Sequence, residues 1–201
     1  MIIEAYVSGV RLPTRRSYGV LGPSTSTEVN FLEVLADAVP RLAKEGISDT
    51  LVRTFATHAL AIANDSRHEV RGSSDYLRRT RQLTSQYSGL LENDVIELHN
   101  IGFPEEGISA FIERATHTCF TTVIENRHLS EERRLENYTR VTRLVKERRK
   151  ARALTKDPYG YINRVFQSVV YGDGANVPPP SPTGITVIDW AIHKVKSVVM
   201  R

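Results

Sequence analysis

The chain has 201 residues, of which 40% are hydrophobic and 25% are charged, and its net charge at pH 7 is +4. This length allows one domain with a real core. The sequence contains no run of about 18 apolar residues, so it predicts no membrane span. The single cysteine, Cys119, excludes a disulfide within the chain and fits a reducing compartment. We therefore expect a cytoplasmic protein, located in the host cytoplasm or the virion if it is viral.

Residues 1–25 are not helical in pattern. Ile3, Ala5 and Val7 alternate with polar neighbours, as in a short strand, and Gly and Pro residues then interrupt the chain repeatedly. The same stretch lacks the basic start and long apolar region of a secretion signal. It predicts an extended N-terminal arm.

Residues 26–172 predict one helical core domain, because apolar residues recur there at helical spacing. Thr25 and Glu28 have the spacing of a capping box, and Leu77 is expected to face the core. The helices expected before residue 124 cover residues 25–46, 49–64, 74–87, 93–99 and 104–123. A loop is expected over residues 65–74.

The net positive charge of the chain is concentrated in residues 127–156. They contain eleven Lys or Arg and four Glu, a net charge of +7, so the remaining residues sum to −3. Ser130 is a suitable N-cap, and the two Glu residues that follow it favour the positive end of a helix dipole. The pattern predicts a basic helix over residues 130–152.

This basic helix has an apolar side and a cationic side when its residues are placed at about 100° intervals. Beyond Val145 the apolar stripe stops, and the chain is charged on every side. Arg is more frequent than Lys in this stretch, which suits forked contacts with phosphate oxygens. The candidate nucleic-acid-binding residues are Arg133, Arg140, Arg143, Lys146, Arg148, Arg149, Lys150 and Arg152.

Asp157 and Pro158 predict the start of a further helix, with Asp as N-cap and Pro in the first turn, and Gly172 is placed to end it. The pattern Asp157-Pro158-x-x-Tyr161-Ile162-x-Arg164-Val165 resembles the helix entry in region 2 of bacterial and phage sigma factors. No helix-turn-helix pattern follows and no acidic segment precedes it, so the family is not assigned. The resemblance implies one alternative, a regulatory DNA- or RNA-binding module that acts on transcription.

The last part of the chain contains three consecutive prolines, Pro178 to Pro180, which favour the extended polyproline form. Residues 173–186 therefore predict a Gly- and Pro-rich strap. Residues 187–201 show helical spacing again and predict a C-terminal helix. In total we expect a mainly α protein of about seven to eight helices.

Catalytic and metal-binding motifs are missing from the sequence. The six His residues are scattered, Cys119 lies in an apolar stripe, and no phosphate-binding glycine loop or nucleophile elbow occurs. His117 and Cys119 are two residues apart and so point to different sides of a helix. We expect no enzyme, no cofactor and no metal site.

The charge of the basic helix allows two interpretations. Exposed helices often carry solvated Arg and Lys, but unmatched charge repels itself unless a partner neutralises it. The modest apolar face favours nucleic acid over a membrane surface. We expect a non-enzymatic RNA- or DNA-binding protein that contacts the phosphate backbone, as a homo-oligomeric subunit of a nucleoprotein assembly such as a viral or phage coat protein. A further alternative is a scaffold subunit that binds an acidic protein.

Overall fold

The computed structural model describes residues 25–69, 75–121, 129–147 and 156–172. These ranges contain six α-helices, one π-helical segment and no strand, which confirms the expected mainly helical fold. The elements are α2 (Thr25–Lys44), α3 (Asp49–Glu69), α4 (Tyr76–Asn100), α5 (Glu105–Ala115), η1 (Thr116–Phe120), α6 (Glu131–Glu147) and α8 (Pro158–Tyr171).

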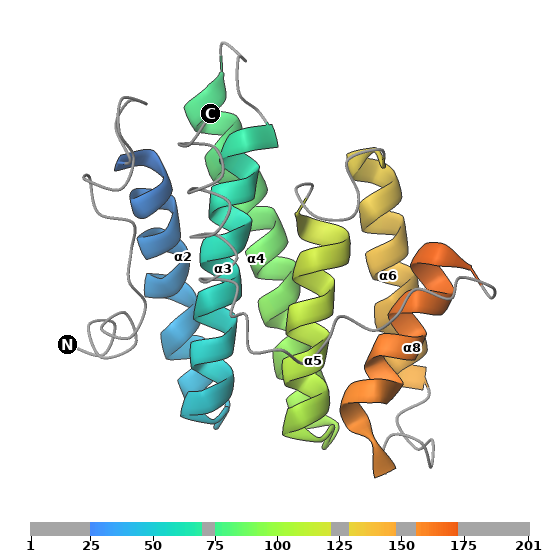
Figure 1. Ribbon diagram of the computed structural model, residues 1–201. Coiled ribbons are helices and arrows are strands. Elements are labelled where there is room, and N and C mark those ends of the chain that lie inside the picture. The colour runs from blue at the N-terminus through green and yellow to red at the C-terminus, as the bar shows by residue number, and fades with distance from the viewer. Residues whose placement is uncertain (1–24, 70–74, 122–128, 148–155, 173–201) are drawn as a thin grey trace, which may run out of the picture.

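The helices stand side by side, and successive helices run in opposite directions, with α8 inclined across α6 (Figure 1). Helix α3 packs against α2, α4, α5 and η1, whereas α8 packs against α5 and α6. Because α4 and α6 are separated by one antiparallel element, both run downwards in Figure 1. Within the described ranges, no helix combines the length and the apolar character that crossing a membrane requires.

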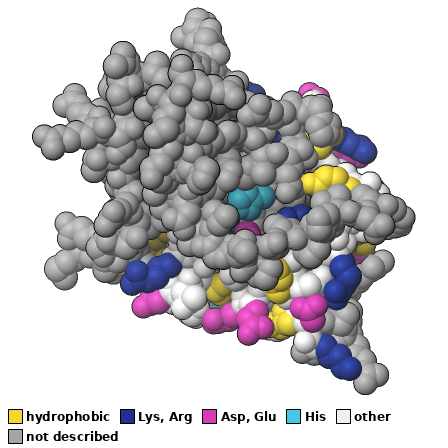
Figure 2. Space-filling view, in the orientation of Figure 1, with side chains coloured by type: hydrophobic (Ala, Val, Ile, Leu, Met, Phe, Trp, Pro, Cys, Tyr) yellow, Lys and Arg dark blue, Asp and Glu magenta, His cyan; other side chains and the backbone are white. Residues whose placement is uncertain are grey.

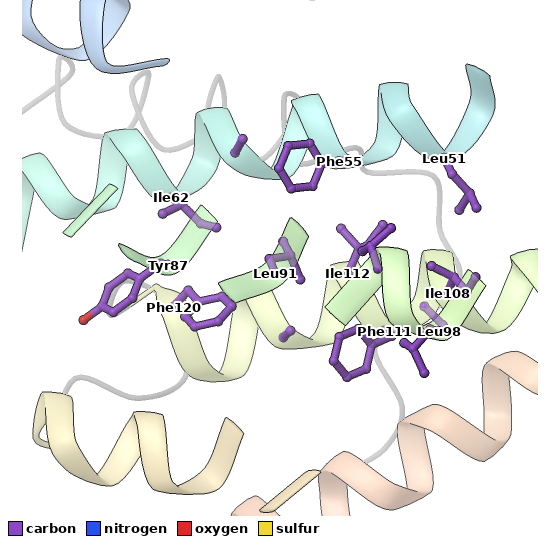
Figure 3. Packing of buried hydrophobic residues seen from close by; sticks show 14 of the residues in the cluster. Leu51, Phe55, Ile62, Tyr87, Leu91, Leu98, Ile108, Phe111, Ile112 and Phe120 are labelled. Carbon is purple, nitrogen blue, oxygen red and sulfur yellow. The ribbon is translucent and has the colours of Figure 1, made fainter. Parts of the chain in front are cut away.

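A continuous apolar core joins the helices, and Figure 3 shows its central part. Aromatic rings link the elements: Tyr87 of α4 stacks on Phe120 of η1 with ring centroids 5.1 Å apart, and Phe120 lies 4.6 Å from Tyr138 of α6. Phe111 of α5 lies 5.8 Å from Phe166 of α8. These rings bury large apolar surfaces and so contribute strongly to the stability of the bundle.

The predicted starts of α6 and α8 are confirmed. Ser130 Oγ accepts a hydrogen bond from the backbone N–H of Arg133 at 3.3 Å, and Asp157 Oδ1 accepts one from Gly160 N at 2.8 Å. At the end of α8, Gly172 has φ 82°, a conformation that side chains disfavour. Local capping chemistry therefore defines both helices.

Helix α3 is longer than the sequence indicated. It continues through residues 65–69, for which a loop was expected, so that prediction is wrong there. Asp65 and Ser66 are 3% and 0% exposed, so they lie inside the bundle although their residue types favour turns. Burial of Asp65 and Ser66 outweighs their low helix propensity.

Helix α4 is one uninterrupted helix, so the expected division into residues 74–87 and 93–99 is wrong. Gly89 lies inside it, and the buried side chains Leu91, Glu92 and Val95 continue its inner face past that glycine. Leu77 is 63% exposed and does not face the core.

The helix expected over residues 104–123 changes character after Ala115. It widens into η1 and ends at Thr121, whose φ and ψ of −118° and 140° are extended. The backbone N–H and the hydroxyl of Thr121 both donate to the carbonyl oxygen of Thr116, each at 3.0 Å. This double hydrogen bond closes the wide turn, and the expected helix through residue 121 is wrong.

The predicted arm up to residue 24, the strap over residues 173–186 and the C-terminal helix over residues 187–201 lie outside the described residues. So does the part of the predicted basic helix that follows Glu147, up to residue 152.

Candidate nucleic-acid interface

Helix α6 carries the first half of the predicted basic element. Tyr138, Val141 and Val145 on its inner side are buried, as its apolar stripe predicted. Arg134 is also buried, at 1% exposure, with its Nη1 donating to the carbonyl of Cys119 at 3.5 Å and its guanidinium carbon 6.0 Å from the Tyr87 ring centroid. This arginine counts towards the charge of the stretch but cannot reach a ligand outside the bundle.

Two of the predicted site residues form ion pairs along the exposed side of α6. Arg133 Nη1 lies 2.5 Å from Glu136 Oε2, and Arg143 Nε lies 3.9 Å from Glu147 Oε1. All four side chains are more than half exposed, so these pairs contribute at most about 0.5 kcal/mol each to stability. The paired Glu residues reduce the positive electrostatic potential that an approaching phosphate would meet.

Lys146 lies between helices. Its Nζ is 2.7 Å from Asp94 Oδ1 and 2.5 Å from Glu97 Oε2, both on α4, and its side chain is 23% exposed. The Tyr138 hydroxyl donates to the other oxygen of Asp94. Burial alone would lower the pKa of Lys146, but the hydrogen bonds with Asp94 and Glu97 outweigh it and raise the pKa. Lys146 therefore joins α6 to α4.

Arg140 differs from these residues, because it is exposed and forms no ion pair with any residue in the described ranges. Of the eight candidate residues, Arg133, Arg140 and Arg143 thus share the outer side of α6, whereas Lys146 is directed to α4. Arg148, Arg149, Lys150 and Arg152 lie outside the described residues.

The surplus charge is concentrated after α6. Residues 131–147 contain five Lys or Arg and four Glu, a net charge of +1, whereas residues 148–156 contain five Lys or Arg and no acidic residue. On the face seen in Figure 2, positive and negative side chains of the described residues are intermixed and form no broad field of one sign. The charge that could attract an anion therefore belongs mainly to the segment 148–156.

Helices α4 and α6 form ion pairs with each other near both of their ends. At their first turns Arg79 Nη2 lies 2.9 Å from Glu131 Oε2, and towards their C-terminal ends Lys146 pairs with Asp94 and Glu97. Because the two helices run in the same direction, the acidic start of α6 meets the basic start of α4, and the basic end of α6 meets the acidic end of α4. These contacts fix the register of α6.

Cys119 is not a candidate nucleophile. It is 0% exposed, and burial raises the pKa of its thiol to about 12, although a hydrogen bond with Thr118 and the charges of Arg134 and Arg114 oppose this. A neutral buried thiol neither attacks a substrate nor binds a metal readily. Cys119 is thus buried, as its position in an apolar stripe predicted.

No sequence pattern indicates that two of the histidines meet. His58 of α3 and His117 of η1 lie edge to face with ring centroids 5.8 Å apart. Only the tertiary contact between α3 and η1 brings them together.

No group of three His, Cys, Asp or Glu side chains in the described part of the chain is placed to hold a metal ion. No protein family, no curated protein and no solved structure matches the chain.

Proposed function

We propose that the chain is a non-enzymatic nucleic-acid-binding protein whose basic segment, residues 148–156, contacts the phosphate backbone together with Arg140 and the outer side of α6. One observation carries the proposal. The described cations of α6 are largely paired with carboxylates or buried, whereas five Lys or Arg without an acidic residue follow directly in sequence.

Nucleic acid fits this segment better than a membrane surface does. A helix that lies on a membrane needs a bulky apolar face for the lipid, but the apolar face of α6 is used inside the bundle by Tyr138, Val141 and Val145. Phosphate contacts by Arg and Lys require no such face and carry no sequence information of their own. The proposed mode is therefore backbone contact, in which affinity depends on salt.

The test compares two charge-matched variants by fluorescence anisotropy, with a 20-nucleotide single-stranded RNA and a 20-base-pair DNA duplex across 50 to 300 mM NaCl. The first variant replaces the four candidate cations after α6 by Gln: Arg148, Arg149, Lys150 and Arg152. We expect its affinity to fall at least about tenfold at 100 mM salt. The slope of log K against log salt should decrease by roughly 0.7 to 0.9 for each phosphate that the variant no longer neutralises.

The control variant removes the same charge from exposed sites on other helices, by changing to Gln the residues Lys44, Arg53, Arg78 and Arg164. This variant is expected to keep the salt slope of the original chain. Equal losses in both variants would assign binding to net charge alone, and an unchanged first variant would contradict the proposal. Lys146 is left intact in both, because its contacts with α4 stabilise the folded protein.

Assembly into a coat or other nucleoprotein particle stays a prediction, because the arm and the strap on which it depends lie outside the described residues. Light scattering combined with the absorbance ratio at 260 and 280 nm, before and after nuclease, tests it. Large particles that contain nucleic acid and shrink after nuclease would support this prediction. A small monomer without nucleic acid would contradict it and would favour a scaffold that binds an acidic protein.

A further inference from the structure

The contact between α3 and η1 contains two ionisable rings. His58 is 5% exposed, and its Nδ1 has no hydrogen-bond partner. His117 lies against it at 5.8 Å with an interplanar angle of 85° and is partly exposed. A buried imidazole in contact with a second imidazole is stable only while it is uncharged, because a protonated ring would lose its hydration without gaining a counter-ion.

The charged groups on the described neighbouring elements do not stabilise a protonated His58 ring. Burial and then the charge of His117 lower the pKa of His58 to about 3. Among the neighbouring elements, Glu92 of α4 is paired with Arg41 of α2 at 2.7 Å, and Glu113 and Arg114 of α5 act on each other.

Asp65 is the buried acidic residue on α3 itself, two turns beyond His58. The charge that acts on His58 is that of His117.

The segment that carries His117 has an unusual backbone. Residues Thr116–Phe120 form a π-helical turn, a geometry that is rare and often found at functional positions. The same segment packs against α5, α3 and α6. This segment therefore contacts both α3 and α6, the helix that carries the candidate interface.

We propose that the His58–His117 pair is an acid-sensitive latch, which holds η1 on α3 when both rings are neutral and releases it when they are protonated. Release exposes His58, so the open form takes up a proton that the closed form excludes. Below about pH 6.5 the equilibrium constant for opening then rises about tenfold for each pH unit through His58 alone. The latch does not depend on the proposed function, although its opening would loosen the contact of η1 with α6.

Hydrogen–deuterium exchange measured by mass spectrometry tests the latch at pH 7.5, 6.5, 5.5 and 4.5, after correction for the intrinsic exchange rate. We expect the protection of peptides over residues 111–121 to fall about tenfold per pH unit below pH 6.5, while peptides of α8 keep theirs. In His58→Phe, which keeps an aromatic ring but cannot be protonated, protection of residues 111–121 should be independent of pH.

His99→Gln is the matched control, because His99 lies near the end of α4 away from the pair, and it should behave like the original chain. Asp65→Asn should also keep the tenfold dependence. Unchanged protection of the original chain at pH 4.5, or an equal loss in α8, would overturn the proposal. If His58→Phe does not fold, an NMR titration of the original chain decides, since an ordinary pKa near 6.5 for His58 in the folded protein would overturn it equally.

Discussion

Gly107 of α5 is packed closely against the side chain of Phe103, which precedes the helix. A Cβ added there would lie 2.6 Å from Phe103 Cε1 and 3.4 Å from Pro158 Cβ. Phe103 is 5% exposed, so its ring has little room to move, and Pro158 begins α8. Gly107 therefore leaves space for the Phe103 ring, whereas Pro158 lies at an ordinary contact distance.

Two Gly→Ala substitutions are expected to have opposite effects. Gly107→Ala should lower the free energy of unfolding by roughly 1 to 2 kcal/mol, because overpacking against Phe103 exceeds the gain in helix propensity. Gly89→Ala is the matched control, since Gly89 lies inside α4 with no atom within 4 Å of an added Cβ, and it should raise stability by about 0.5 to 1 kcal/mol. Urea unfolding measures both, and a stabilising Gly107→Ala would contradict the predicted packing.

At the scale of whole elements, helix starts differ in how they are capped. Asp157 accepts a hydrogen bond from Gly160 N, whereas Asp75, which precedes α4, makes no side-chain cap bond and instead pairs with Arg78 at 2.6 Å. We expect Asp157→Ala to cost about 1 kcal/mol and Asp75→Ala to cost at most about 0.5 kcal/mol in urea unfolding. Equal costs would show that the Asp157 bond does not define the start of α8.

The pairing of α6 with α4 can be measured by double-mutant cycles. Lys146→Met keeps the apolar stem of the side chain and leaves Asp94, which is 13% exposed, without its cation. The coupling energy between Lys146 and Asp94 should be about 0.5 to 2 kcal/mol, whereas the coupling to Glu97, which is 54% exposed, should be at most about 0.5 kcal/mol. Urea unfolding of single and double variants gives both values, and a larger coupling to Glu97 would contradict this order.

Local signals in the sequence predicted α6 and α8, because Ser130, Asp157 and Pro158 act on their own first turns. The sequence did not predict the length of α3 or the continuity of α4, because burial of Asp65 and Ser66 and packing beyond Gly89 override residue propensities. At the candidate interface the apolar and cationic sides of α6 were predicted. The partners of Lys146 and the burial of Arg134 were not, since both depend on contacts with other helices.

At the scale of the whole molecule, the reactivity of the Cys119 thiol shows whether the helical bundle keeps solvent out of its core. Its thiol is 0% exposed and its pKa is raised to about 12, so the native protein should react with a thiol reagent at pH 7.5 at least about a hundredfold more slowly than the chain in 6 M urea. Absorbance of the released reagent measures the rate. Leu77→Cys supplies an exposed thiol on α4 as a reference, and native Cys119 reacting as fast as that reference would contradict the described core.

The shared direction of α4 and α6 has a consequence for how the chain reaches its native state. The hydrogen bonds that join them connect residues 44 to 52 positions apart, so α4 and α6 meet only when the chain between them closes a long loop. Closing such a long loop costs conformational entropy before the stabilising contacts between α4 and α6 form. This order slows folding relative to a bundle with local contacts only. We therefore expect the contacts of Lys146 to form late in folding, so that Lys146→Met accelerates unfolding and changes the refolding rate little, as stopped-flow measurements in urea would show.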